Sequence, residues 1–306
     1  MGPDTLLLLL ALRGSLISAW GSPAAVASPQ RQNRPALHSA LQSERAGVSV
    51  ALEMRRDRYD CRFENRSSFN TSYLVPHFFE QRHEADNAWL VARLRFNAAG
   101  HSWVTEAGVT PSTGGAGSDY DTFYQPDGNI VVYGTTAGTA VRSWRVAQYI
   151  GLGSWRGTRL RVGYSYRRDR AIYRPSASTT SQTSPPSVSS FWNTDRETTI
   201  AEVHDVRFGA ERSMAVSSRW HLSATADVSP TTLARLSTIL PDKYTDPVVF
   251  IAKGFSVDTG LRVSGRTGRL EVGASVGYIR TWNYGRRNQF HRSGLGASLF
   301  VGVTRH

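Results

Sequence analysis

Two aspartates spaced one residue apart, Asp119 and Asp121, are the residues of this sequence best suited to acid–base chemistry. They lie in GGAGSDYDTFY (114–124), a stretch rich in glycine and polar residues and without apolar periodicity. Two carboxylates held close together raise the pKa of one of them, so that one can donate a proton. Three interpretations stay open: turn residues of a polar loop, a catalytic pair, or, with Asp127 and Asn129 nearby, a calcium site.

Other residue types that carry chemistry give weaker patterns. Cys61 is the only cysteine, so an internal disulfide or a metal site built on several cysteines is excluded. The eight histidines show no metal-ligand spacing, so we expect no zinc site and no cofactor. The glycine-rich stretch GLGSWRG (151–157) lacks the strand–turn–helix context of a phosphate-binding loop.

The composition is basic. Lys and Arg number 36 against 24 Asp and Glu, which gives a net charge of +12 over 306 residues. Only Lys243 and Lys253 are lysines, so nearly all of the excess is arginine. Such an excess favours anionic partners, and arginine suits a bidentate grip on phosphate. A high genomic G+C content produces the same bias.

The N-terminal residues predict export. An apolar run, Leu6–Leu12, is followed by the small-residue cleavage site Ala25-Val26-Ala27. We expect a signal peptide over 1–27 and a linker over 28–45, although Asp4 and Arg13 are unusual within a signal peptide. Beyond this segment no run of about 18 apolar residues predicts a membrane-spanning helix.

The dominant period of the remaining chain is two, which is typical of strands. VSVALEM (48–54) and RLRVGYSYR (159–167) alternate apolar residues with small or charged ones. Ten strands are predicted, at 46–56, 87–98, 101–110, 142–152, 158–173, 198–215, 219–228, 248–264, 269–282 and 291–304.

The connections between these strands alternate strictly in length. Tight joins such as Ala99-Gly100 separate long segments at 57–86, 111–141, 174–197, 229–247 and 283–290. This pattern predicts an all-β fold over 46–306: a ten-stranded antiparallel transmembrane β-barrel of a bacterial outer membrane, with short periplasmic turns and long extracellular loops. A secreted β-sandwich is the alternative, and the ending FVGVTRH lacks the terminal aromatic residue common in such barrels.

The second face of each strand would line the lumen of this barrel. It carries charges of both signs, among them Glu53, Arg145 and Asp258. Buried charges must pair, and a ten-stranded barrel is too narrow for a broad aqueous pore. We therefore expect a network of ion pairs inside the barrel.

Ten strands with a D-x-D pair in the second long loop resemble the omptin family of outer-membrane proteases. The stretches GYSYRRDRAIY (163–173) and DTGLRVSGRTGRLEVGASVGYIR (258–280) add local similarity. The resemblance implies a surface endopeptidase in which the Asp pair faces an Asp–His dyad of the fourth loop across an activated water. It implies catalytic roles for Asp119, Asp121 and Asp242.

The fourth loop departs from the omptin pattern. Its best match to the family's D-x-H motif is Asp242-Lys243-Tyr244. A phenol with a pKa near 10 is a poor base at neutral pH. The alternative to a protease is therefore a non-enzymatic outer-membrane barrel that serves adhesion, lipid contact or scaffolding, or acts as a small channel.

Omptins also bind lipopolysaccharide through basic residues on the outer rim of the barrel. The resemblance extends this role to a cluster at the upper end of the fifth strand: Arg167, Arg168, Arg170 and Arg174. We expect outer-membrane lipid as a partner, lipopolysaccharide as a requirement for activity, a peptide or protein substrate for an active enzyme, and no nucleic acid.

Overall fold

The computed structural model describes residues 46–67, 74–192, 195–241 and 243–304. The predicted signal peptide and linker, and Asp242, lie outside these ranges. The described chain contains eleven strands: β1 (Gly47–Ser67), β2 (Val75–Ala98), β3 (His101–Tyr124), β4 (Ile130–Trp155), β5 (Thr158–Thr183), β6 (Pro186–Phe191), β7 (Glu197–Ala215), β8 (Trp220–Ile239), β9 (Val248–Thr267), β10 (Leu270–Tyr284) and β11 (Asn288–Thr304).

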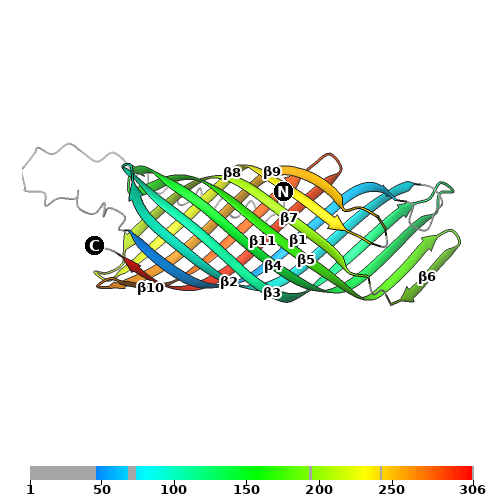
Figure 1. Cartoon of the computed structure of the whole chain (residues 1–306), viewed down its shortest axis with the longest axis horizontal. Coiled ribbons are helices and arrows are strands. Elements are labelled where there is room, and N and C mark those ends of the chain that lie inside the picture. Colours follow the sequence, from blue (N-terminus) through cyan, green and yellow to red (C-terminus); the bar gives the residue numbers. More distant parts are fainter. Residues whose placement is uncertain (1–45, 68–73, 193–194, 242, 305–306) are drawn as a thin grey trace, which may run out of the picture. The chain divides into compact units, whose positions relative to one another are not determined.

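Ten of these strands close into a ring. Each pairs antiparallel with its neighbours in the order β4-β3-β2-β1-β11-β10-β9-β8-β7-β5, and the β4–β5 pairing completes the circle. The remaining strand, β6, pairs only with β5 and forms a hairpin at one end of the ring (Figure 1). The predicted ten-stranded antiparallel barrel is confirmed.

Among the described residues, no helix has the length and apolar character needed to span a membrane.

The short turns are confirmed, whereas the long loops are shorter than predicted. Ala99 and Gly100 join β2 to β3 with positive φ angles of 50° and 78°, as expected of a two-residue hairpin turn. The predicted loops 57–86 and 111–141 instead continue the flanking strands for most of their length. Polar side chains hide the apolar alternation there, but the backbone ladder depends only on the peptide groups.

One end of the barrel carries an apolar outer band. On β1, Val48, Val50, Leu52 and Met54 point outward and are exposed, and Arg56 follows them on the same face. Exposed apolar residues continue the band around the ring at Leu90, Leu94, Val109, Val146, Leu160, Phe208, Leu261, Val276, Leu299 and Val301. A continuous apolar band on a closed barrel is a lipid-facing surface, and it places the chain in an outer membrane.

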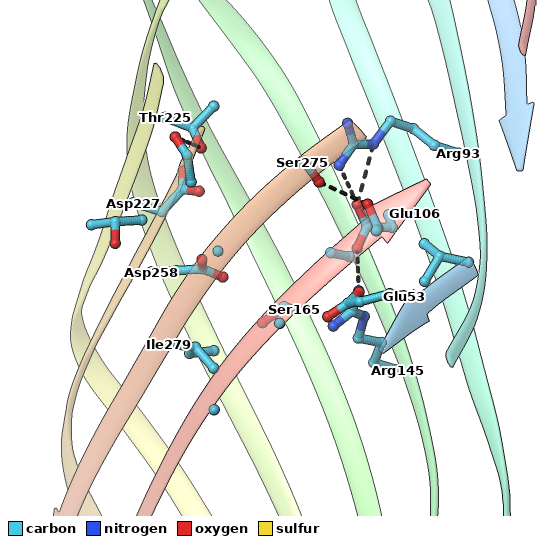
Figure 2. A pocket seen from close by; sticks show the side chains of 18 of the residues that line it. Glu53, Arg93, Glu106, Arg145, Ser165, Thr225, Asp227, Asp258, Ser275 and Ile279 are labelled. Carbon is cyan, nitrogen blue, oxygen red and sulfur yellow. Dashed lines mark hydrogen bonds and ion pairs between the residues drawn. The ribbon is translucent and has the colours of Figure 1, made fainter. Parts of the chain in front are cut away.

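The lumen inside the band is filled by ion pairs, as predicted. Figure 2 shows Arg93 and Arg145 reaching toward Glu106 and Glu53, and the Nη2 atoms of both arginines approach a glutamate oxygen to 2.7–2.8 Å. Deeper in the interior, Asp57 contacts Arg55 and Arg292 at 3.0 Å each. A cavity of about 240 Å³ is left between these side chains.

The apolar band gives a direct stability prediction. Leu52→Arg places a charge in the lipid-facing band and is expected to lower the free energy of unfolding by about 2–4 kcal/mol. Tyr120→Arg, at an outward and exposed site beyond the band, is the matched control and should change it little. Urea unfolding in lipid vesicles measures both; equal effects would contradict the assignment of the band.

Candidate active site

Asp119 and Asp121 point into the barrel near the end opposite the apolar band. Both lie on β3, where alternate residues share a face, and both side chains are buried. Their backbone partners on β2 are Gln81 and Phe79. The strand, rather than a flexible loop, therefore holds the two carboxylates side by side.

Lys243 reaches the aspartates from the opposite wall. It lies in the turn between β8 and β9, which stands across the ring from β3. Its Nζ is 2.8 Å from Asp121 Oδ2 and 2.7 Å from Glu197 Oε1, and 4.0 Å from Asp119 Oδ2. The aspartates therefore contact the turn that follows β8 through Lys243.

An imidazole joins the cluster from β2. Nε2 of His77 lies 2.7 Å from Asp121 Oδ1, and Nδ1 lies 2.5 Å from the hydroxyl of Tyr244. The ring stacks on Phe123 with centroids 4.4 Å apart and an interplanar angle of 4°. These contacts fix a carboxylate–imidazole–phenol chain whose order is Asp121, His77, Tyr244.

Sequence reasoning misses His77 because the sequence predicts a loop over 57–86. The signal was the alternation in VPHFFEQRH (75–83), which places Val75, His77, Phe79 and Gln81 on one face. All four are buried inside the barrel. An assignment of this segment as a strand would have pointed His77 at the aspartates.

Glu197 also escaped sequence analysis, and it is held by a polar chain. Gln81 Nε2 donates to Glu197 Oε2 at 3.2 Å, and the Thr199 hydroxyl donates to Gln81 Oε1 at 2.8 Å. Glu197 is the first residue of β7, where no motif marks it in the sequence. It brings a third carboxylate to the site.

Burial raises the pKa of Asp119 well above its usual range, and the nearby Glu197 and Asp121 carboxylates raise it further, against the opposing effect of Lys243. Oxygens of the Asp119 and Glu197 carboxyl groups lie within 4.8 Å of each other, which disfavours a negative charge on both groups at once. Asp119 Oδ1 has no hydrogen-bond partner within the described part of the chain. Asp119 is therefore suited to hold a proton at neutral pH.

This raised pKa predicts a pH-dependent stability. A carboxyl whose folded pKa lies above its unfolded value near 3.9 stabilises the fold fully below that value, and the contribution is lost as pH rises through the folded pKa. Asp119→Asn removes this dependence. The urea midpoint of the variant minus that of the wild type should therefore increase as pH rises from acid to neutral. A constant difference across that range would contradict the prediction.

Three carboxylates, from Asp119, Asp121 and Glu197, have oxygens within 4.8 Å of one another. Such a set could bind a divalent cation, but the ammonium of Lys243 already lies among them. The calcium interpretation also includes Asp127 and Asn129. Asp127 Oδ1 accepts a hydrogen bond from the backbone amide of Asn129, and Asn129 Oδ1 accepts from the backbone amides of Thr183 and Ser184. These two residues act as turn residues.

The arginine cluster is divided by the barrel wall. Arg167 is a correction: it points inward, is buried, and pairs with Asp169 at 2.7 Å, so it cannot contact lipid. Arg168, Arg170 and Arg174 are exposed on the outer face, and lipid binding by these three stays a prediction. Asp242 also stays a prediction, because it lies outside the described residues.

A groove opens beside the site at the mouth of the barrel. Its volume is about 830 Å³, and Lys243 and Tyr244 form part of its wall. Phe63 and Phe250 supply apolar surface, and Arg66, Asp246 and Arg287 supply charge. The phenol of Tyr244 thus separates the buried imidazole from an open space large enough for several side chains.

Neither a protein-family model nor a curated protein matches the sequence. Among solved structures, the chain is similar to the outer-membrane protease OmpT of Escherichia coli, with a TM-score of 0.61 and 12% identity over 86% of this chain and 98% of that one. The translocator domain of the autotransporter NalP of Neisseria meningitidis is also similar, with a TM-score of 0.35 and 8% identity over 96% of each chain.

The fold and its lipid-facing band define the class of protein: an outer-membrane β-barrel. At 12% identity the likeness to OmpT concerns the fold alone. The chemistry of this chain has to be argued from its own residues.

Proposed function

We propose that this chain is a surface endopeptidase of the outer membrane, built on the omptin plan. The observation that carries the proposal is the meeting of Asp119 and Asp121 with His77 and with the Lys243–Tyr244 turn across the mouth of the barrel. His77 and Lys243 lie 44 and 122 residues from Asp121 in the sequence, and both contact its buried side chain. Clusters of titratable groups of this kind are typical of catalytic sites.

The roles follow from the contacts. Asp121 accepts a hydrogen bond from Nε2–H of His77, which leaves Nδ1 as the basic nitrogen. Asp119, with its raised pKa, supplies a proton to the leaving amine, as a general acid does. Lys243 offsets the negative charge of Asp121 and Glu197. Together these groups would activate a water for attack on a peptide carbonyl.

The groove beside Tyr244 is suited to an extended peptide. Its wall combines aromatic surface with charges of both signs, as substrate clefts commonly do. The exposed arginines Arg168, Arg170 and Arg174 suit lipid phosphates. We infer that lipopolysaccharide is the lipid that supports the active form.

The test is cleavage of a panel of internally quenched peptides, with basic and neutral residues around the scissile bond. The wild-type protein is refolded with and without lipopolysaccharide. We expect cleavage of at least one peptide class, and faster cleavage with the lipid. Absence of cleavage of every peptide in both preparations would favour the second candidate, a non-enzymatic barrel.

One observation favours that second candidate. Lys243 contacts both Asp121 and Glu197, so the cluster is largely charge-compensated without a substrate. A cluster with balanced charges would stabilise the mouth of a barrel that serves adhesion or scaffolding.

A further inference from the structure

His77 cannot meet a substrate directly. Its side chain is 1% exposed, and both ring nitrogens are already engaged, by Asp121 and by Tyr244. Phe123 covers one face of the ring, and Phe63 and Phe79 lie at its edges. The phenol hydroxyl of Tyr244 is therefore the group through which the imidazole can exchange a proton with the groove.

We propose that Tyr244 is a catalytic residue that passes a proton between the hydrolytic water in the groove and Nδ1 of His77. This inference rests on the proposed endopeptidase function. Two residues would then take the role of the histidine in the omptin D-x-H motif. The Tyr244 phenol faces the water, and the more deeply buried His77 imidazole holds the proton.

The proton balance is complete without a co-reactant. As the water oxygen forms its bond to the peptide carbonyl carbon, a water proton moves to Tyr244 Oη and the phenol proton moves to His77 Nδ1. The carbonyl π electrons move to the carbonyl oxygen. When the C–N bond breaks, the C=O bond re-forms from an electron pair of the oxygen, and the C–N electron pair stays on the nitrogen. The amine takes a proton from Tyr244, which regains one from His77, or from Asp119, whose proton is then restored by the one stored on His77.

The surroundings of the phenol fit a relay. Burial raises the pKa of Tyr244, and the Asp121 carboxylate raises it further, so the resting phenol keeps the proton that the relay passes inward. The side chains of Asn65 and Ser67 lower the pKa of Tyr244, against the effect of burial, and polar neighbours of this kind favour the negative charge that develops on the phenol oxygen. A phenol with these partners never needs to ionise fully.

The relay is tested with Tyr244→Phe and Tyr244→His in the refolded protein with lipopolysaccharide, using the best peptide for the wild type. Tyr244→Phe keeps the ring and is expected to lower kcat by roughly 10²–10⁴-fold with little change in KM. Tyr244→His places a base directly at the groove and should recover part of the loss. Tyr124→Phe, an exposed tyrosine at the end of β3, is the matched control.

A proton inventory in mixed H2O and D2O adds a readout that a purely structural role would not move. The wild type should show a curved dependence of kcat, because two protons move in the rate-limiting step, and Tyr244→His should show a dependence closer to linear. A kcat of Tyr244→Phe close to that of the wild type would overturn the relay and leave the endopeptidase proposal standing. No cleavage by the wild type would overturn both.

Discussion

His77→Gln is expected to lower kcat/KM for peptide cleavage by roughly 10²–10⁴-fold. Glutamine can retain a hydrogen bond to Asp121, but its amide cannot accept and return a proton. Within the described part of the chain, His77 is the one imidazole that contacts the aspartate pair, through Asp121. Steady-state cleavage of a quenched peptide measures the effect.

His83→Gln provides the control. His83 lies on the same face of β2, is buried, and hydrogen-bonds to the Tyr173 hydroxyl at 2.7 Å. Burial lowers its pKa to about 3, so it is neutral at physiological pH. Within the described part of the chain its Nε2 has no hydrogen-bond partner, so it hydrogen-bonds to neither Asp119 nor Asp121. Equal losses in the two variants would mean that His77 acts only through packing.

Asp57→Ala is expected to lower the free energy of unfolding by about 3–5 kcal/mol, because it leaves the buried Arg292 without its counter-charge. Asp57 is fully buried and contacts Arg55 and Arg292 at 3.0 Å each, and Asn87 donates to it at 2.8 Å. Urea unfolding monitored by the mobility shift of the folded barrel measures the change.

Asp60→Ala is the matched variant for Asp57. Asp60 also lies on β1 but faces outward, where it pairs with Arg62 at 3.1 Å in a partly exposed contact. Surface pairs contribute about 0–1 kcal/mol. A loss at Asp57 no larger than that at Asp60 would contradict the view that the interior network holds the barrel together.

The sequence was sufficient to predict the barrel because lipid imposes a simple rule on it. Every outward residue in the band must be apolar, and the alternation in VSVALEM (48–54) therefore survives as a visible pattern. Beyond the band, water replaces lipid and the rule lapses. For this reason the sequence predicts a loop where the strands continue through Arg58 and His77.

The candidate site was predictable only in part. Asp119 and Asp121 form a local motif that sequence reasoning can find, and their spacing places them on one face of a strand. Lys243, Glu197 and His77 reach them from three other parts of the ring, so their contacts depend on ring closure and register. The prediction for Arg167 is wrong because it groups neighbouring arginines by sequence alone. Adjacent residues of a strand point to opposite faces, so Arg167 and Arg168 lie on opposite sides of the barrel wall.

The central claim is that the buried cluster at the mouth of the barrel hydrolyses peptides. Its most direct test is kcat/KM for one quenched peptide, measured for the folded wild type and for the double variant Asp119→Asn, Asp121→Asn, both refolded with lipopolysaccharide. The claim predicts that cleavage by the double variant falls to the background rate while the barrel stays folded. Cleavage by the folded double variant at the wild-type rate would contradict it.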